Sequence, residues 1–266
     1  MVCPQEDYID NTEFLRRFVA QARRLRIPLH GSLDLTYRCN LRCVHCYAGP
    51  LPNRTQTGHK ELTTEQTISI IDQVADAGCL FLLITGGEPL VRKDFRDVYR
   101  HAKNRGLFVT VFTNGTRIDE KTISLFEDFP PLAVEISIYG IRAKTHDRVT
   151  GVPGSHKRTM KAVELLIDRG IRVTLKTVLM TLNRDELAGM EGLARQRGLK
   201  FRFDAMISPR LDGSRSPLKF RVSPDEAVQG ELSNPDRARQ WRDPRNRPVP
   251  SPVASGCGGD QMVRCA

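Results

Sequence analysis

Three cysteines lie close together at positions 39, 43 and 46, and their spacing suits a shared metal centre. Thiolates in a C-x3-C-x2-C pattern can converge on one centre, but they make an incomplete set of ligands. A structural zinc ion takes four protein ligands, and a ferredoxin-type 4Fe–4S cluster takes four cysteines. A cluster held by Cys39, Cys43 and Cys46 would therefore keep one iron open for another molecule.

Two simpler interpretations use the same residues. A zinc knuckle could take His45 as its fourth ligand, although this residue stands between two of the cysteines, where its reach to the same metal is cramped. Buried core thiols or a single reactive cysteine would not need this spacing. The pattern indicates a metal centre and leaves the kind of metal open.

A second pattern, Thr85-Gly86-Gly87-Glu88-Pro89, closes the next apolar segment of the chain. Two glycines let the backbone pass close to a ligand, and a carboxylate beside them can receive an ammonium group. The same residues also suit an ordinary turn.

Together, the two patterns resemble the radical S-adenosylmethionine (SAM) superfamily. In that family the open iron of a 4Fe–4S cluster binds the amino and carboxylate groups of SAM. The resemblance implies that the three cysteines hold the cluster and that Tyr47 is the aromatic residue that follows them. It also implies three contacts to the methionyl amino group, from Gly86, Gly87 and Glu88.

The resemblance implies further cofactor contacts at the ends of later strands. Asn114 belongs to a Thr-Asn-Gly element, for which a plain Asn-Gly turn is the alternative. Ser137 matches the serine of an S-x-D-G element whose aspartate is replaced by Tyr139. Arg148 lies where relatives place an arginine near the methionyl carboxylate, although in many of them it stands two positions later, and a surface position is equally compatible.

Other polar residues are expected in or beside the cavity that would hold the cofactor at the strand ends. Asp204, predicted to be buried in an apolar strand, demands a partner or a role; we expect either a loop cap or a catalytic acid or base. Lys176, Thr177 and Asn183 are predicted to point into or beside the cavity. His45 and His146 are expected to be exposed loop histidines.

The elements that must position these residues follow a strand–helix rhythm from residue 31 to residue 206. Apolar segments predict six strands, at 32–37, 80–85, 107–113, 132–138, 171–179 and 200–206, the last five close to continuously apolar as in strands buried on both faces. Helices between them are predicted to stop at Gly78, Gly106, Gly170 and Gly198. Capping boxes are predicted at Thr63 with Gln66 and at Asn183 with Glu186. Periodicity fits an open doubly wound sheet equally well; the resemblance implies an α/β fold with a partial (β/α)6 TIM-like barrel of parallel strands.

Composition narrows the class of protein. The 266 residues carry a net charge of +10 and seven cysteines, and no apolar run approaches a membrane span. The N-terminus lacks the layout of a signal peptide, which predicts a cytoplasmic protein with reduced thiols. Basic residues gather in an N-terminal helix and in a proline-broken segment from Arg237 to Arg247, expected to be a solvated linker. Neither segment carries the interleaved aromatic residues of a single-strand binding platform, so nucleic acid is not expected as a partner. The rival hypothesis from a different functional class is a zinc-containing nucleic-acid-binding module.

The run from Asp34 to Tyr47 most resembles the superfamily branch that carries a C-terminal SPASM domain, which includes peptide maturases and enzymes of modified haem synthesis. This implies three regions: an N-terminal helical extension (1–30), a radical SAM partial barrel (31–225), and a linker with the start of an incomplete SPASM-like auxiliary domain (226–266). Cys257 would be the first ligand of that domain, apparently truncated, whereas Cys265 has no clear counterpart. We expect one cluster per chain.

The resemblance also implies an activity. The reduced cluster would cleave SAM to a 5′-deoxyadenosyl radical, which abstracts hydrogen from a peptide or protein side chain. A tetrapyrrole or small cofactor precursor is the alternative substrate within the same chemistry. The expected reductant is a flavodoxin or ferredoxin.

Overall fold

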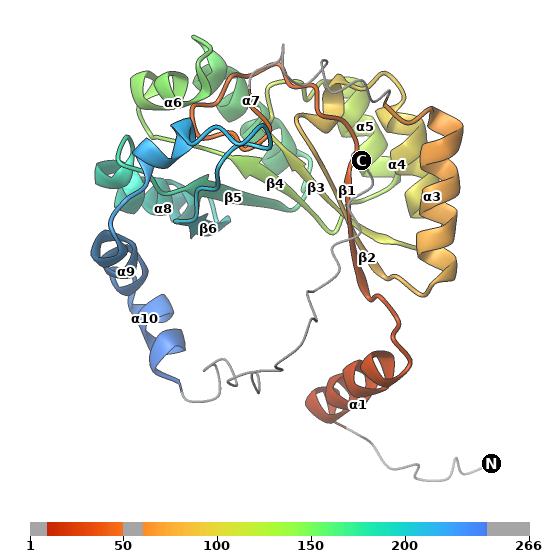
Figure 1. Cartoon of the computed structure of the whole chain (residues 1–266). Helices are drawn as coiled ribbons and strands as arrows, with labels where there is room; N and C mark the ends of the chain where they lie inside the picture. Colours follow the sequence, from red (N-terminus) through yellow and green to blue (C-terminus); the bar gives the residue numbers. More distant parts are fainter. Residues whose placement is uncertain (1–9, 50–60, 244–266) are drawn as a thin grey trace, which may run out of the picture.

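The computed structural model describes residues 10–49 and 61–243. Six parallel strands pair in the order in which the chain makes them, and the sheet is open (Figure 1). They are β1 (His30–Asp34), β2 (Phe81–Thr85), β3 (Phe108–Thr113), β4 (Ala133–Ser137), β5 (Val173–Val178) and β6 (Lys200–Asp204). The predicted partial (β/α)6 barrel is confirmed.

Helices connect the strands and cover the outer side of the curved sheet (Figure 1). They are α3 (Thr64–Asp76), α4 (Phe95–Asn104), α5 (Glu120–Asp128), α6 (Ala143–Thr150), α7 (Ser155–Asp168) and α8 (Leu187–Gln196), with short 3-10 turns η1 (Pro89–Val91), η2 (Arg184–Glu186) and η3 (Ser216–Phe220). Helix α1 (Asn11–Arg24) precedes the barrel, and α9 (Pro224–Leu232) and α10 (Pro235–Arg242) follow it.

The hydrophobic core lies between the sheet and these outer helices. Alternate strand residues such as Ile84, Val111 and Ile136 are fully buried there, because successive side chains of a strand point to opposite faces. Helix residues such as Val98 and Leu166 complete the same cluster.

The inner face of the sheet is only partly covered, so the prediction of strands buried on both faces is wrong in detail. Phe108 on this face is 49% exposed, and β6 alternates between half-buried and exposed residues. That alternation follows from its place at the sheet edge, where only β5 pairs with it. The first strand also ends earlier than expected, at Asp34, after which the chain turns into the loop that carries the three cysteines.

The predicted helix ends are largely confirmed. All four glycines have positive φ angles, between 66° and 90°, and Thr63 forms its capping box with Gln66. The second predicted capping box is wrong. Asn183 makes no cap hydrogen bond, and the Glu186 carboxylate instead accepts backbone N–H bonds from Ile141 and Arg142 at 2.8 and 3.0 Å.

The segment expected to be a linker is partly helical. Helices α9 and α10 occupy most of residues 224–242, and Arg237 forms an ion pair with Glu191 of α8 at 2.9 Å. Arg237 also lies over the Phe203 ring, 5.0 Å from its centroid, so helix α10 packs against the barrel.

Cys257 and Cys265 lie outside the described residues. In the described ranges, none of the helices is both long and apolar enough to span a membrane.

Candidate functional site

The cysteine triplet, defined as Cys39, Cys43 and Cys46, lies on the loop that follows β1. All three side chains are half-buried and none forms a disulfide. The backbone N–H of Leu41 donates to Cys39 Sγ at 3.4 Å, and Cys46 N–H donates to the Cys43 carbonyl at 3.1 Å. The loop therefore turns tightly enough to keep three thiols at one end of the strand.

The Gly-Gly-Glu segment after β2 holds this loop from one side. Gly87 N–H donates to the Thr36 carbonyl at 2.6 Å and Glu88 N–H to the Arg38 carbonyl at 2.9 Å. A Cβ added at Gly87 would lie 2.3 Å from the Arg38 carbonyl oxygen, and one at Gly86 would lie 2.4 Å from that of Thr36. Both glycines are required because another backbone passes beside them.

The Glu88 carboxylate is completely buried. It accepts hydrogen bonds from the N–H of Asn114 at 2.7 Å, the hydroxyl of Thr113 at 2.8 Å and the N–H of Leu90 at 3.1 Å. Burial raises the pKa of Glu88 to about 7, against the lowering effect of these donors. In this structure the carboxylate joins the ends of β2 and β3, and its predicted contact with a cofactor ammonium stays a prediction.

Asn114 extends the connection back to the cysteines. Its side-chain amide donates to Asn40 Oδ1 at 3.0 Å and to Cys39 Sγ at 3.9 Å. Asn40 in turn donates to the Thr116 hydroxyl at 2.7 Å. The Thr-Asn-Gly element thus supplies a hydrogen-bond donor to the first thiol of the triplet, a kind of contact that sets the potential of sulfur-bound clusters.

The C-terminal end of α6 also holds the loop. Arg42 N–H donates to the Thr150 carbonyl at 2.8 Å, and Val44 N–H donates to the Val149 carbonyl at 2.9 Å. Asp147 stabilises the connection from α6 to α7 by accepting from three groups at the start of α7, at 2.6 to 2.9 Å. The triplet is therefore clamped between two rigid segments.

Ser137 and Tyr139 lie beneath the triplet at the end of β4. Tyr139 is 8% exposed, its side chain hydrogen-bonds to Ser137, and burial together with the charge of all three cysteines raises its pKa. Its ring contacts that of His45 at a centroid distance of 4.8 Å. The three thiols thus lie near this tyrosine, at the carboxyl ends of the parallel strands, where barrel enzymes carry their sites.

Neither of the two histidines expected to be exposed is exposed: His45 is half-buried and His146 is buried. His146 is 1% exposed and its Nδ1 accepts the Tyr139 N–H at 3.2 Å. Burial lowers the pKa of both His45 and His146 to about 4, so both rings are neutral at physiological pH. Their role here is packing beneath the loop.

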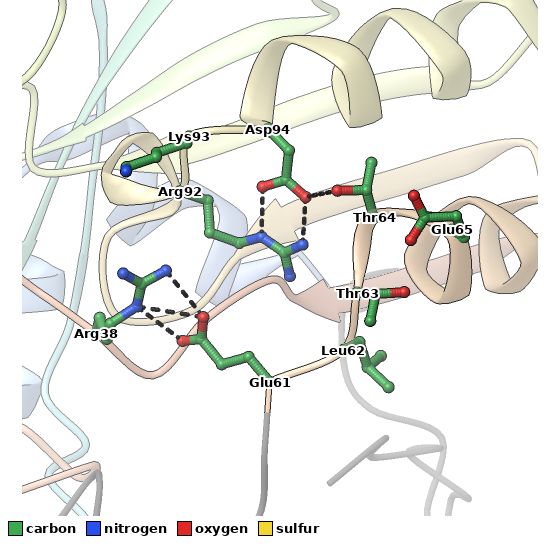
Figure 2. A pocket seen from close by; sticks show the side chains of 9 residues that line it. All are labelled: Arg38, Glu61, Leu62, Thr63, Thr64, Glu65, Arg92, Lys93 and Asp94. Atoms are coloured by element: carbon green, nitrogen blue, oxygen red, sulfur yellow. Dashed lines mark hydrogen bonds and ion pairs between the residues drawn. The ribbon is translucent and has the colours of Figure 1, made fainter.

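A solvent-open cavity of about 350 Å³ lies on the outer flank of the loop, beside the segment that leads into Cys39. Figure 2 shows two ion pairs among its charged side chains, Arg38 with Glu61 and Arg92 with Asp94, whereas Lys93 and Glu65 are drawn without an ion pair. The Arg92 guanidinium also donates to the Leu35 carbonyl at 3.0 Å. The Arg92 contacts therefore form a third brace on the end of β1.

Two residues predicted to contact the cofactor are exposed. Tyr47 is 40% exposed, and its hydroxyl donates to Asp34 at 3.3 Å, while its carbonyl accepts the Leu211 N–H at 2.8 Å. Arg148 is exposed on the last turn of α6. The roles assigned to both stay predictions.

The predictions for β5 and β6 are partly wrong. Thr177 and Asn183 are buried on the outer side, where the Asn183 amide donates to the Thr177 hydroxyl at 3.3 Å. Asp204 is exposed rather than buried, and it accepts the Met206 N–H at 2.7 Å as a turn cap. Lys176 alone of this group combines the inner face with a partly buried side chain.

Sequence reasoning missed the residues that position the loop through their backbone. Val149 and Thr150 hold it through carbonyl oxygens, which every residue type possesses. Asp147 likewise gives no local signal, because it lies within α6, seven residues before Gly154, the N-cap position of α7 at which a capping side chain would be expected.

Comparisons with known proteins agree with this geometry. The radical SAM superfamily model matches residues 33–194, more than half of the chain. An AdoMet-dependent haem synthase from Methanosarcina barkeri is 34% identical over 165 residues, 62% of this chain and 46% of the relative. A PqqA peptide cyclase from Granulibacter bethesdensis is 29% identical over 171 residues, 64% and 45% respectively. The chain thus spans less than half the length of these two curated relatives.

The fold likeness extends to solved structures. SuiB from Streptococcus suis bound to S-adenosylmethionine superposes with a TM-score of 0.64 at 18% identity, covering 91% of this chain and 53% of that chain. SuiB has also been solved bound to the precursor peptide SuiA, with a TM-score of 0.59 at 19% identity, covering 76% and 46%.

The residues of the loop also suit the family's cluster chemically. Within residues 10–49 and 61–243, no three His, Cys, Asp or Glu side chains are arranged to hold a single metal ion. A 4Fe–4S cluster has a different requirement, since each thiolate binds its own iron atom. Three half-buried thiols on one loop, of which Cys39 receives N–H donors from Leu41 and Asn114, suit such a cluster. The chain belongs to the radical SAM superfamily, with relatives among peptide-modifying enzymes and haem synthases.

Proposed function

We propose that this chain is the catalytic core of an enzyme that uses a 4Fe–4S cluster on the cysteine triplet to generate a substrate radical from SAM. The observation that carries the proposal is the clamp on the cysteine loop. Backbone hydrogen bonds from Gly87 and to Val149 hold the loop that carries three thiols near Tyr139. When bound, the cluster supplies the electron that cleaves SAM to methionine and a 5′-deoxyadenosyl radical.

The residues of the chain bind and orient the reactants. Ser137, on the inner face beneath the triplet, supplies a hydroxyl for the cofactor, and Asn114 steadies Cys39. Glu88 fixes the loop that carries Asn114. Tyr47 and Arg148 are proposed at the rim of the cofactor site, and Asp204 at the substrate side as an acid or base.

The proposed substrate is a peptide or protein side chain. PqqA peptide cyclase is a relative in sequence, and SuiB, which shares the fold, has been solved with its precursor peptide. The inner face of the sheet supports the proposal, because it is partly exposed and bordered by polar strand residues. A flavodoxin or ferredoxin is proposed as reductant.

A tetrapyrrole or small cofactor precursor is the second candidate. The specific observation in its favour is the 34% identity to an AdoMet-dependent haem synthase. The two candidates share the cluster chemistry and differ only in the molecule that loses hydrogen.

Anaerobic cleavage of SAM tests the common step. The reconstituted protein, reduced with dithionite, should release 5′-deoxyadenosine and methionine in equal amounts, and SAM should change the paramagnetic resonance signal of the reduced cluster. Cys79→Ala is a matched control, because this buried cysteine lies in the core outside the loop. Stoichiometric zinc without iron or sulfide would refute the proposal and favour the zinc-module rival.

Deuterium transfer then identifies the substrate class. Deuterated candidate peptides, chosen first from short reading frames beside the gene, are compared with a deuterated tetrapyrrole. Deuterium should appear in 5′-deoxyadenosine only with a true substrate. Transfer from the tetrapyrrole alone would replace the first candidate by the second.

A further inference from the structure

Lys176 has an unusual environment on the inner face of the sheet. It lies on β5 with Ser137 of β4 and Arg202 of β6 as its register partners. Its ammonium Nζ lies 3.3 Å from the centroid of the Phe112 ring, and the Arg202 guanidinium carbon lies 5.2 Å from the same centroid. Two cations therefore share one aromatic ring.

The nearby carboxylates are committed elsewhere. Glu135 forms an ion pair with Arg202, and Asp204 accepts the Met206 N–H at 2.7 Å. Among the described residues, no carboxylate lies within ion-pair distance of Lys176, and no hydrogen bond of its ammonium is formed. Glu135, Arg202 and Asp204 are the charged groups that act on it.

This arrangement leaves Lys176 incompletely satisfied. An aromatic face attracts a cation but accepts none of its three N–H donors in the way an oxygen does. Burial, with Arg202 as a further cause, lowers the pKa of Lys176 to about 8. A bound anion would supply both the acceptor and the compensating charge that are missing.

We propose that Lys176, seated on Phe112 beside Arg202, binds a carboxylate of the substrate. The inference rests on the proposed function, since it names a recognition group within the same barrel. Lys176 is the strand neighbour of Ser137, so a molecule held there lies beside the proposed cofactor site. Two sources of the carboxylate fit this chemistry: an acidic residue or C-terminus of a peptide, and a propionate of a tetrapyrrole.

Two pairs of probes distinguish these sources. One pair is acetyl-Gly-Glu-Gly-amide and its glutamine counterpart; the other is coproporphyrin III, which has four propionates, and its tetramethyl ester. Binding is measured to the cluster-loaded full chain with SAM present, by calorimetry for the peptides and by fluorescence for the porphyrins. Lys176→Met removes the charge, Lys176→Arg keeps it, and Lys161→Met, an exposed lysine on α7, is the matched control.

At least one acidic probe should bind wild type more tightly than its neutral counterpart. Lys176→Met should weaken the acidic probe about tenfold to a hundredfold, as expected for a charge-assisted hydrogen bond, and leave the neutral probe unchanged. Lys176→Arg and Lys161→Met should keep the preference. The probe that shows this effect identifies the source of the carboxylate.

Several results would overturn the inference. Equal binding of acidic and neutral probes by wild type would do so, as would an unaltered preference in Lys176→Met. A fall in SAM affinity alone would assign the ammonium to the carboxylate of the cofactor instead. Iron content and thermal melting check that each variant folds, and Lys176→Gln replaces the methionine variant if that one does not. Failure of wild type to cleave SAM would instead refute the proposed function, so the two failures are distinguishable.

Discussion

The buried Glu88 carboxylate makes the stability of the protein depend on pH in a predictable direction. Burial raises its pKa from 4.5 to about 7 in the folded chain. Between these two values the folded state binds more protons than the unfolded state, so stability falls as pH rises through the window. For a single group with these two pKa values, the loss between pH 5 and pH 8 is about 2.5 kcal/mol.

Glu88→Gln isolates this contribution because an amide does not titrate. Glutamine can accept from two of the three donors with its single oxygen, and its NH₂ group then faces the third. That mismatch costs about 1–3 kcal/mol at every pH. The gap between wild type and Glu88→Gln should therefore shift by about 2.5 kcal/mol in favour of the variant from pH 5 to pH 8.

Urea unfolding of the cluster-free chain at several pH values measures this gap. Taking the difference between two proteins cancels the titration of all other groups, and Glu164→Gln, a half-exposed surface carboxylate, controls for loss of a charge. Parallel stability curves for wild type and Glu88→Gln would refute the reasoning. They would mean that the three donors offset the desolvation of the carboxylate.

Three further predictions concern the cysteine loop. Alanine at any position of the cysteine triplet should abolish release of 5′-deoxyadenosine and, with all three replaced, remove about four irons per chain; full cleavage by any single variant would show that the cluster lies elsewhere. Asn114→Ala removes the donor to Cys39 and should speed loss of iron to a chelator on the order of tenfold, whereas an unchanged rate would reduce Asn114 to a turn residue. Gly87→Ala places a methyl group 2.3 Å from the Arg38 carbonyl oxygen and should lower Tm by at least about 3 °C. Gly192→Ala, whose Cβ meets nothing within 4 Å in helix α8, should raise Tm slightly; equal shifts in the two variants would contradict the close approach.

Much of the fold could be predicted because its signals are local. A helical segment that ends at a glycine and is followed at once by an apolar segment marks a helix–strand connection, and all six strands were expected in the right order. The errors arise where a distant partner decides. Glu186 follows Asn183 at capping-box spacing, yet Arg142 and the adjacent backbone bind its carboxylate, because a charged partner and two N–H donors satisfy it better than one helix end.

The place of the cysteine triplet in the fold was predictable, and the residues that support it were less so. Spacing alone brings the cysteine triplet together, and the structure places it at the carboxyl end of β1 as expected. The two glycines were correctly singled out, but the group that approaches them is the backbone at Thr36 and Arg38. Sequence indicates that something passes close to a glycine without saying what it is. Asp204 was expected to be buried because β6 was interpreted as an apolar strand buried on both faces, whereas its place at the sheet edge leaves Asp204 exposed.

The residues that support the cysteine loop and those on the open inner face of the sheet have separate proposed roles in the barrel. Residues 36–44 are held by backbone contacts from the segment after β2 and from the end of α6. Lys176 and Arg202 belong to the inner face and make none of these contacts. On the proposal that Lys176 binds the substrate, substitutions there would change which molecule is bound while the cysteine triplet stays in place. In such an arrangement, the groups that select the substrate and those that fix the thiols lie on separate parts of the chain. Proteins that share this fold could therefore differ in substrate.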